Sequence, residues 1–532
     1  MTPDLIIQGG TIVDGTGRSG YLADIAVFDG RVAAIGTFDS LPGVACLDAH
    51  GLTVTPGFID IHSHSDFTLL IDPRAISAIA QGVTTEVVGN CGHGCAPIAD
   101  AELVKSNIYG YREGFDLSWR GVGEYLERLE AVQPAVNVLT LVPNGNLRLA
   151  TVGLKNRPAT LDELRRMQKL LHEGLEEGAF GFSTGLEYET ETGCSESEIV
   201  ALCATTAAVG GFYATHTRNR DNEAEETIAE AIRTANKSDL PLQISHISVV
   251  ARLEEDGGQA VEQALKQVDI ARSSGGDVTF DMHTRLFGTT NLSAALPAWA
   301  LEGTRSQIAE RLQTPSTRRD LKQHRSIVTA LAGNDWSQIV VSECKAHPEY
   351  CRQDVQTIAR AKGVTPLDAV YDLLNDDIED LHSLMIVAHS YREEEIRAAF
   401  EHPECMIGSD ATTLSPDGPL ANTIFHGAYT WASWFLRHFA RDKKLLTLEE
   451  AVRRITSLPA SRLGVSDRGT IEVGSCADIS VFDPQTYAEQ GTTFDPNQLA
   501  TGMVHVVVNG IVAMNDSRLT NERGGQVLRR NN

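Results

Sequence analysis

Short apolar runs alternate with longer amphipathic stretches through the central part of the chain. Stretches of helical periodicity, including 161–176, 224–234 and 258–273, separate several of the apolar runs. Repeated strand and helix units build a parallel sheet with right-handed crossovers. Eight units predict an α/β fold, a TIM-like (β/α)8 barrel. The eight candidate strands are 58–62, 84–88, 135–142, 179–183, 212–216, 242–246, 277–281 and 405–409.

The two ends of the chain carry β-rich runs without such helices. These runs lie at 5–7, 25–27 and 32–35 near the start, and at 479–482 and 504–508 near the end. Asp29-Gly30 and Asn509-Gly510 favour type I′ turns, so each predicts a hairpin. We therefore expect residues 1–55 and 466–532 to build one small β-sandwich domain beside a barrel of residues 56–465.

One connection in the expected barrel is too long for a single crossover. It joins the seventh candidate strand to the eighth and contains helical patterns at 366–374 and 392–400. Long connections in compact domains commonly carry extra structure over a binding site. The sequence therefore predicts a helical insertion at about 286–400.

Composition narrows the class of protein. The formal charge of -26 over 532 residues disfavours nucleic acid and anionic membranes as partners, so we expect a small-molecule substrate. The apolar runs fall short of the ~20 residues of a membrane span, and the first residues do not resemble a secretory signal. Nine dispersed cysteines argue for a reducing compartment, so we expect a cytoplasmic protein and leave its oligomeric state open.

His62-Ser63-His64 closes the first candidate strand and suggests metal chemistry. Side chains at i and i+2 of a strand share a face, so both imidazoles can bind one ion. An isolated pair of this kind is more often a packing or solvated pair. Here other candidate strands also end in polar residues, namely His216, His246 and Asp410, where core strands favour Val or Ile. Because barrel active sites form at strand carboxyl ends, we interpret the residues at these four strand ends as a metal site.

Several segments together resemble the amidohydrolase superfamily, and more closely its N-acyl-D-amino-acid deacylase (D-aminoacylase) branch. They are 56–64, Gly89-Asn90-Cys91-Gly92, 181–188, the two later histidines and Gly408-Ser409-Asp410. The resemblance implies a barrel with a small β-sandwich domain and a hydrolase that cleaves an amide C–N bond. It also implies one or two Zn2+ ions per chain.

The resemblance assigns metal ligands residue by residue. It places His62, His64 and Asp410 around one position and Cys91, His216 and His246 around the other. Many binuclear relatives use a carbamylated lysine after the fourth strand, but this chain reads Phe182-Ser183-Thr184 there. Cys91 then becomes the bridging or primary thiolate; considered alone, it could equally be a turn cysteine between glycines.

A mechanism follows from this ligand set. Zinc lowers the pKa of bound water toward ~7 and polarises a carbonyl group. Asp410 is expected to accept the proton of that water and to deliver it to the departing nitrogen. Asp410 could also be a plain metal ligand, or serve both roles.

Two substrate classes are compatible with the residues at the expected carboxylate site. The lysine and arginine that the family uses to bind the substrate carboxylate are replaced by Ser248 and Gly427. A relocated cation could replace them, and the candidates at strand ends are Arg218, Arg220, Arg252 and Arg285. Single arginines are more often surface residues. Alternatively, the substrate is a different amide, lactam or carbamate that has no carboxylate at this place.

Two further residues complete the candidate substrate site. Tyr188 is retained from the family pattern and could hydrogen-bond to the substrate. His283 follows the seventh candidate strand. Its side chain could equally face the pocket or pack in the core. A non-catalytic scaffold without metal is the remaining alternative, and the presence of every ligand disfavours it.

Overall fold

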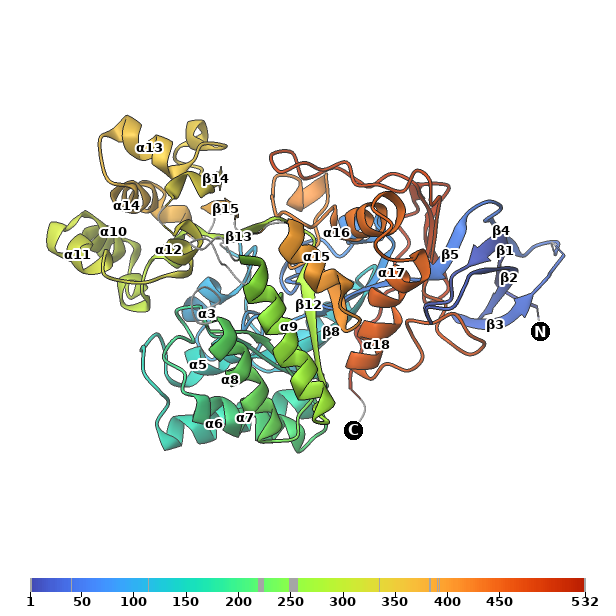
Figure 1. The fold of residues 1–532 in the computed structure, drawn as a ribbon, viewed down its shortest axis with the longest axis horizontal. Coiled ribbons are helices and arrows are strands. Elements are labelled where there is room, and N and C mark those ends of the chain that lie inside the picture. Colours follow the sequence, from blue (N-terminus) through green and yellow to red (C-terminus); the bar gives the residue numbers. More distant parts are fainter. Residues whose placement is uncertain are drawn as a thin grey trace.

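Eight parallel strands form the centre of the protein (Figure 1). The computed structural model describes residues 2–530 except 40, 113, 219–223, 248–256, 334, 382–383, 390 and 392. The strands pair in chain order, and the last returns to the first because the Asp410 amide donates to the His62 carbonyl oxygen at 2.8 Å. The predicted barrel is therefore confirmed. Its strands are β6 (Phe58–Asp60), β7 (Val83–Val88), β8 (Asn137–Pro143), β9 (Gly181–Gly185), β10 (Phe212–His216), β11 (Leu242–Ile244), β12 (Val278–His283) and β16 (Cys405–Gly408).

Helices surround this barrel and cover its outer face. Helix α6 matches the predicted range and begins with a capping box, in which Thr160 and Glu163 satisfy each other's backbone amides. The longer helices of the ring are α4 (Val122–Val132), α5 (Asn144–Thr151), α6 (Leu161–Glu176), α7 (Glu196–Ala207), α8 (Ala224–Asn236), α9 (Gly257–Ser273), α15 (Glu393–Glu401), α17 (Leu448–Arg454) and α18 (Ser457–Leu463). Shorter segments are α1 (Thr68–Ile71), α2 (Ile76–Ile79), α3 (Ala101–Val104) and α16 (Trp431–Phe435).

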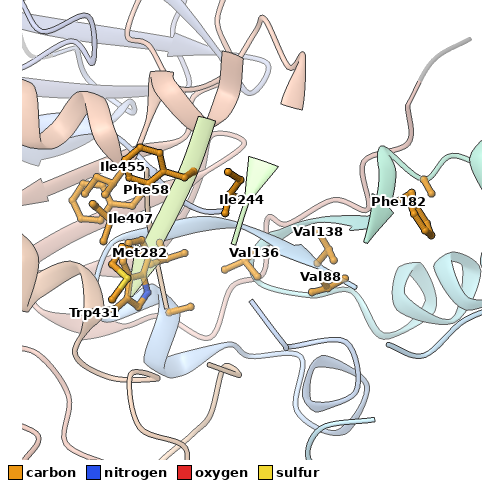
Figure 2. Close-up of a cluster of buried hydrophobic side chains, with 14 of the residues drawn as sticks. Phe58, Val88, Val136, Val138, Phe182, Ile244, Met282, Ile407, Trp431 and Ile455 are labelled. Atoms are coloured by element: carbon orange, nitrogen blue, oxygen red, sulfur yellow. The ribbon is translucent and has the colours of Figure 1, made fainter. Parts of the chain in front are cut away.

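The main hydrophobic core lies between the strands and these helices. Figure 2 shows part of it, where Phe58, Val88 and Met282 from three strands lie among other buried apolar side chains. Strands buried on both faces need apolar residues at nearly every position, and this explains why they appear as continuous apolar runs in the sequence. The polar residues that interrupt these runs at their carboxyl ends are therefore exceptional.

Segments from both ends of the chain share a second sheet of nine strands. Strand β17 pairs with β5, so the late segment joins the early one directly. The predicted hairpins are present, at Asp29-Gly30 between β2 and β3 and at Asn509-Gly510 between β18 and β19, with positive φ at all four residues. The strands are β1 (Leu5–Ile12), β2 (Tyr21–Phe28), β3 (Arg31–Gly36), β4 (Ala45–Asp48), β5 (Thr53–Pro56), β17 (Ile479–Phe482), β18 (Met503–Val508), β19 (Ile511–Asn515) and β20 (Arg518–Leu519).

Hydrogen bonds link all nine strands into one sheet, which branches where β1 pairs with β2, β4 and β5. The sheet encloses a separate apolar core that includes Ile7, Ile25 and Val481. After β20 the chain leaves this sheet and runs along the barrel, where the Leu528 amide donates to the Val138 carbonyl oxygen at 2.8 Å. The exact domain boundaries stay a prediction.

The insertion between β12 and β16 is only partly helical. It contains α10 (Arg305–Gln313), α11 (Pro315–Leu321), α12 (Ile327–Ala332), α13 (Val355–Lys362) and α14 (Pro366–Asp376), and it has its own hydrophobic core. It also contains an unpredicted sheet in which β15 (Met385–His389) pairs with both β13 (Phe287–Asn291) and β14 (Ile339–Glu343). The segment predicted at 392–400 forms α15, whose Ile396 and Phe400 pack into the barrel core rather than into the core of the insertion.

The insertion and the terminal sheet lie on opposite sides of the barrel in Figure 1. Among the described residues, the helices lack the combination of length and apolar sequence that crossing a bilayer requires.

Candidate metal centre

All six residues predicted as metal ligands lie at the carboxyl ends of barrel strands. Parallel strands place these ends on one rim, where barrel active sites form. Five of the side chains are buried, and Asp410 keeps 23% of its side chain accessible. His62 and His64 follow β6, Cys91 follows β7, His216 ends β10, His246 follows β11 and Asp410 follows β16.

The ligand atoms form two groups that share the Cys91 sulfur. The first group contains His62, His64, Cys91 and Asp410; the second contains Cys91, His216 and His246. Within each group the atoms lie within 4.8 Å of one another. The fold thus brings together all six residues, although they come from distant parts of the sequence.

The distances within these groups suit zinc. Cys91 Sγ lies 3.2 Å from His62 Nε2 and 3.5 Å from His246 Nε2. Asp410 Oδ1 lies 3.3 Å from His64 Nε2 and 3.5 Å from His62 Nε2. Two ligands bound tetrahedrally to one zinc, each at ~2.0–2.3 Å, are separated by ~3.3–3.8 Å. The residues therefore fit a zinc ion with little movement of their side chains.

Three of the six residues have strained backbone conformations. The φ angles are +53° at Cys91, +31° at His246 and +43° at Asp410. Left-handed conformations cost non-glycine residues about 1–3 kcal/mol each and cluster at functional sites. Their presence at three strand ends indicates that the fold is constrained to aim these side chains at one place.

Two carboxylates that the sequence analysis did not single out orient the histidines. Asp281 Oδ1 lies 3.0 Å from His62 Nδ1 and accepts the backbone amide of His246 at 2.8 Å. Glu187 Oε2 lies 3.0 Å from His216 Nε2. Such contacts fix the tautomer of a ligand histidine, leaving Nε2 of His62 and Nδ1 of His216 as the candidate ligand atoms. The sequence contained a signal for Asp281, because it is an acidic residue inside an apolar strand, two residues before His283.

Burial and neighbouring charges act in opposite directions on the pKa values of Cys91 and His62. Burial raises the pKa of the Cys91 thiol, and His62 offsets part of this effect. Burial alone would lower the pKa of His62, but Cys91 and Asp281 raise it well above its usual value. Sulfur and imidazole thus stabilise each other's charged forms, and the thiolate is the form of cysteine that binds metals.

Asp410 is held as a carboxylate by its neighbours. Burial alone would raise its pKa, but the hydrogen bond with His64 and the positive charge of Arg285 keep it well below its usual value. Arg285 Nη2 lies 2.9 Å from Asp410 Oδ2. A second acid beneath the centre behaves differently, since burial and the nearby Glu86 raise the pKa of Asp60 to about 8.

A narrow cavity adjoins the ligand groups and has a larger pocket beside it. Tyr109, Tyr188, Thr290 and Ile327 line both spaces, so they separate the metal centre from a pocket of about 730 Å3. The pocket lies between barrel loops and the insertion, and its volume is within the range of small-molecule sites. A larger groove of about 1490 Å3 contains none of the predicted site residues.

The predicted substrate residues divide into three groups. Tyr188 and His283 line the narrow cavity, with ring centroids 4.8 Å from His216 and 6.5 Å from His246 respectively. Arg285 contacts Asp410, as described above. Arg218 instead pairs with Glu230 and donates to two backbone carbonyls.

The other two candidate arginines, Arg220 and Arg252, lie outside the described residues, as does Ser248, which replaces the lysine of the family. Tyr109 was not predicted. Its ring centroid lies 4.7 Å from that of His64, and its hydroxyl donates to the Tyr188 hydroxyl at 3.4 Å.

A parallel barrel with imidazoles, a thiolate and a carboxylate on one rim defines the class of metal-dependent barrel hydrolases. Comparison with known proteins narrows this class. The amidohydrolase family model matches residues 45–514, and the chain belongs to the amidohydrolase family. The predicted family is therefore confirmed.

Individual relatives extend over the full chain. A D-aminoacylase of Alcaligenes xylosoxydans xylosoxydans is 31% identical, with 99% of this chain and 98% of the relative aligned. The crystal structure of N-acyl-D-glutamate deacylase from Bordetella bronchiseptica, with zinc and a phosphonate inhibitor, is 29% identical, covers 100% of both chains and has a TM-score of 0.81. A D-aminoacylase structure described for its binuclear metal centre is 31% identical, covers 99% of this chain and 100% of its own, and has a TM-score of 0.80.

Proposed function

We propose that this protein is a zinc-dependent hydrolase that removes the acyl group from N-acyl-D-amino acids. The observation that carries the proposal is the convergence of six metal-ligating side chains on one barrel rim at zinc-ligand spacing. The family and the relatives' activities and zinc support the reaction class and the metal. Zn2+ would be held by His62, His64, Cys91, His216, His246 and Asp410, as one or two ions.

The residues of this chain divide the work of hydrolysis. A metal held by these residues would lower the pKa of water and polarise the substrate carbonyl group. Asp410 accepts a proton from the attacking water as a carbon–oxygen bond forms, and delivers it to the amide nitrogen as the carbon–nitrogen bond breaks. His64 and Arg285 hold the Asp410 carboxylate in its charged form, which a general base requires.

The pocket beside the centre offers room for a large substituent. Its lining includes apolar side chains of the insertion, such as Leu301, Ile308 and Ile327. Acidic groups, including Glu102, Glu189 and Glu379, outnumber the basic Lys105 and Arg305 in its lining. We therefore expect a bulky neutral group to bind there more readily than an acidic one.

Two measurements test the proposal. Metal analysis of the purified protein should find stoichiometric zinc, whereas a scaffold would contain none. Wild-type enzyme should then hydrolyse a panel of N-acetyl-D-amino acids faster than neutral and cyclic amides of similar size. Failure on every acid substrate, with activity on a neutral amide, lactam or carbamate, would replace the proposal with the alternative reaction.

The cysteines bear on the cellular context. All nine cysteines are free thiols in the structure, which is typical of a reducing compartment. We therefore propose a cytoplasmic location and a small molecule as the partner.

A further inference from the structure

We propose that the Arg285 guanidinium binds the carboxylate of the substrate and so selects acids over neutral amides. This inference rests on the proposed function and identifies the residue that determines its specificity. It follows from the position, the hydrogen bonding and the charge of one buried side chain.

Arg285 lies two residues beyond β12, on the rim that carries the metal ligands. Only 4% of its side chain is accessible to solvent. Nη2 donates to the Asp410 backbone oxygen and to Asp410 Oδ2, each at 2.9 Å, and Nη1 donates to the His426 backbone oxygen. Nε is buried without a hydrogen-bond partner. A buried donor without an acceptor costs about 1–3 kcal/mol, so a ligand oxygen at Nε would be favoured.

The charge of Arg285 is only partly balanced by the protein. Its ion-pair partner Asp410 also interacts with His64 at 3.3 Å and with His62 at 3.5 Å. Asp410 is therefore shared between the guanidinium and the two imidazoles, of which His62 also lies 3.0 Å from Asp281. A buried cation of this kind is stabilised by a further anion, and an N-acyl-amino acid carries one close to the bond that breaks.

Gly427 creates the space that the guanidinium occupies. A Cβ atom at position 427 would lie 2.4 Å from Arg285 Nη1 and 2.8 Å from the Ser409 backbone oxygen. The φ of +98° at this residue also favours glycine. The absence of a side chain at 427 is thus the condition under which Arg285 can reach the metal centre.

Arg218, the other predicted arginine within the described residues, has contacts that leave little room for the same role. Both Nε and Nη2 lie 3.2 Å from Glu230 carboxylate oxygens, and Nη2 also donates to the Cys194 backbone oxygen at 2.9 Å. The competing role for Arg285 is to position Asp410 without touching the substrate. The two roles differ in which substrates they affect, since a positioning residue acts on acids and neutral amides alike.

The first test compares N-acetyl-D-leucine with N-acetyl-D-leucinamide as substrates of wild type and Arg285→Met. Loss of a hydrogen bond to a charged group, at about 1.5–3 kcal/mol, should lower the acid-to-amide ratio of kcat/KM by about 10- to 150-fold. The loss should appear mainly in KM for the acid. An unchanged ratio, with both substrates equally impaired, would overturn the inference and make Arg285 a positioning residue for Asp410.

Arg462→Met is the matched control. Arg462 is also buried, with 3% of its side chain accessible, and pairs with Asp277 at 2.6 Å near the start of β12, the other end of that strand. The Arg462→Met variant loses a comparable buried charge at a place remote from the metal centre. Its acid-to-amide ratio of kcat/KM should therefore equal that of wild type. Gly427→Ala is the second test variant, because its added Cβ displaces Nη1 while the arginine remains. It should lower the same ratio, and thermal unfolding of each variant shows whether it is folded.

A binding measurement separates this inference from the proposed function. Calorimetry with the chelator-treated, metal-free wild type should show tighter binding of N-acetyl-D-leucine than of N-acetyl-D-leucinamide, and Arg285→Met should abolish the difference. Equal losses for both ligands would contradict the inference. If wild type hydrolyses neither compound, the proposed function fails, and the calorimetric comparison still decides the role of Arg285.

Discussion

Replacing Asp281 by Asn should weaken metal binding while leaving the fold intact. Asp281 accepts three hydrogen bonds in the structure, from His62 Nδ1 at 3.0 Å, the His246 amide at 2.8 Å and Gln243 Nε2 at 2.9 Å. Asparagine has nearly the same shape, and its amide oxygen can keep the first two bonds. Its amide nitrogen would face Gln243, whose side chain can turn over to present oxygen. The substitution therefore removes the negative charge with little change of shape.

The size of the effect follows from the role of Asp281 toward His62. Together with Cys91, Asp281 raises the pKa of His62 well above its usual value against the opposing effect of burial, so it makes that imidazole a better electron donor. Carboxylates that hold a metal-ligating histidine commonly contribute 10- to 100-fold to metal affinity or activity. We expect zinc affinity to fall by about that factor, which corresponds to about 1.4–2.7 kcal/mol.

Competition with a zinc-binding dye at fixed pH measures this loss directly. Asp277→Asn is the matched control, because Asp277 directly precedes β12, far from the rim, and its carboxylate pairs with Arg462. Its zinc affinity should equal that of wild type. A zinc affinity for Asp281→Asn within twofold of wild type would refute the assignment of Asp281 as the residue that holds His62.

Three further predictions concern the centre and the scaffold. Asp410→Asn should retain most of its zinc and lose turnover, because the amide cannot accept a proton; near-normal turnover with bound metal would contradict the mechanism. Cys91→Ala should lower the zinc content measured by elemental analysis, since Cys91 belongs to both ligand groups, and full zinc loading would exclude a shared thiolate. Arg148→Met should destabilise the fold by about 3–5 kcal/mol in denaturant titration, because it leaves buried Glu198 without its partner at 2.6 Å; a loss below about 1 kcal/mol would show that the ion pair is dispensable.

The sequence allowed the barrel, the histidines and Asp410 to be predicted because they depend on local pattern, whereas Cys91 was predicted only from the family resemblance. Strands buried on both faces must be apolar, so the polar residues at their ends, such as His216 and His246, stand out. The order of strands in a parallel barrel then places those ends on one rim. The boundaries of α6 and β10 followed from helical periodicity and from the apolar run respectively.

The small sheet of the insertion could not be predicted in this way. Strands β13 and β15 lie at opposite ends of the insertion, and β14 lies between them in the sequence. Each is a short run whose hydrogen bonds depend on a distant partner. The helical periodicity between them dominated the pattern, so the insertion was predicted as helical.

The substrate residues show most clearly what sequence alone left undetermined. Arg218 and Arg285 both follow a barrel strand, and nothing in their neighbouring residues distinguishes them. Tertiary structure decides between them. Arg218 pairs with Glu230, whereas Gly427 leaves room for Arg285 beside Asp410. Local sequence thus fixed which chemical groups reach the rim, since alternation and strand ends are local properties. Only long-range packing decided that Arg285, rather than Arg218, lies beside Asp410, because Asp410 and Gly427 come from segments far away in the chain.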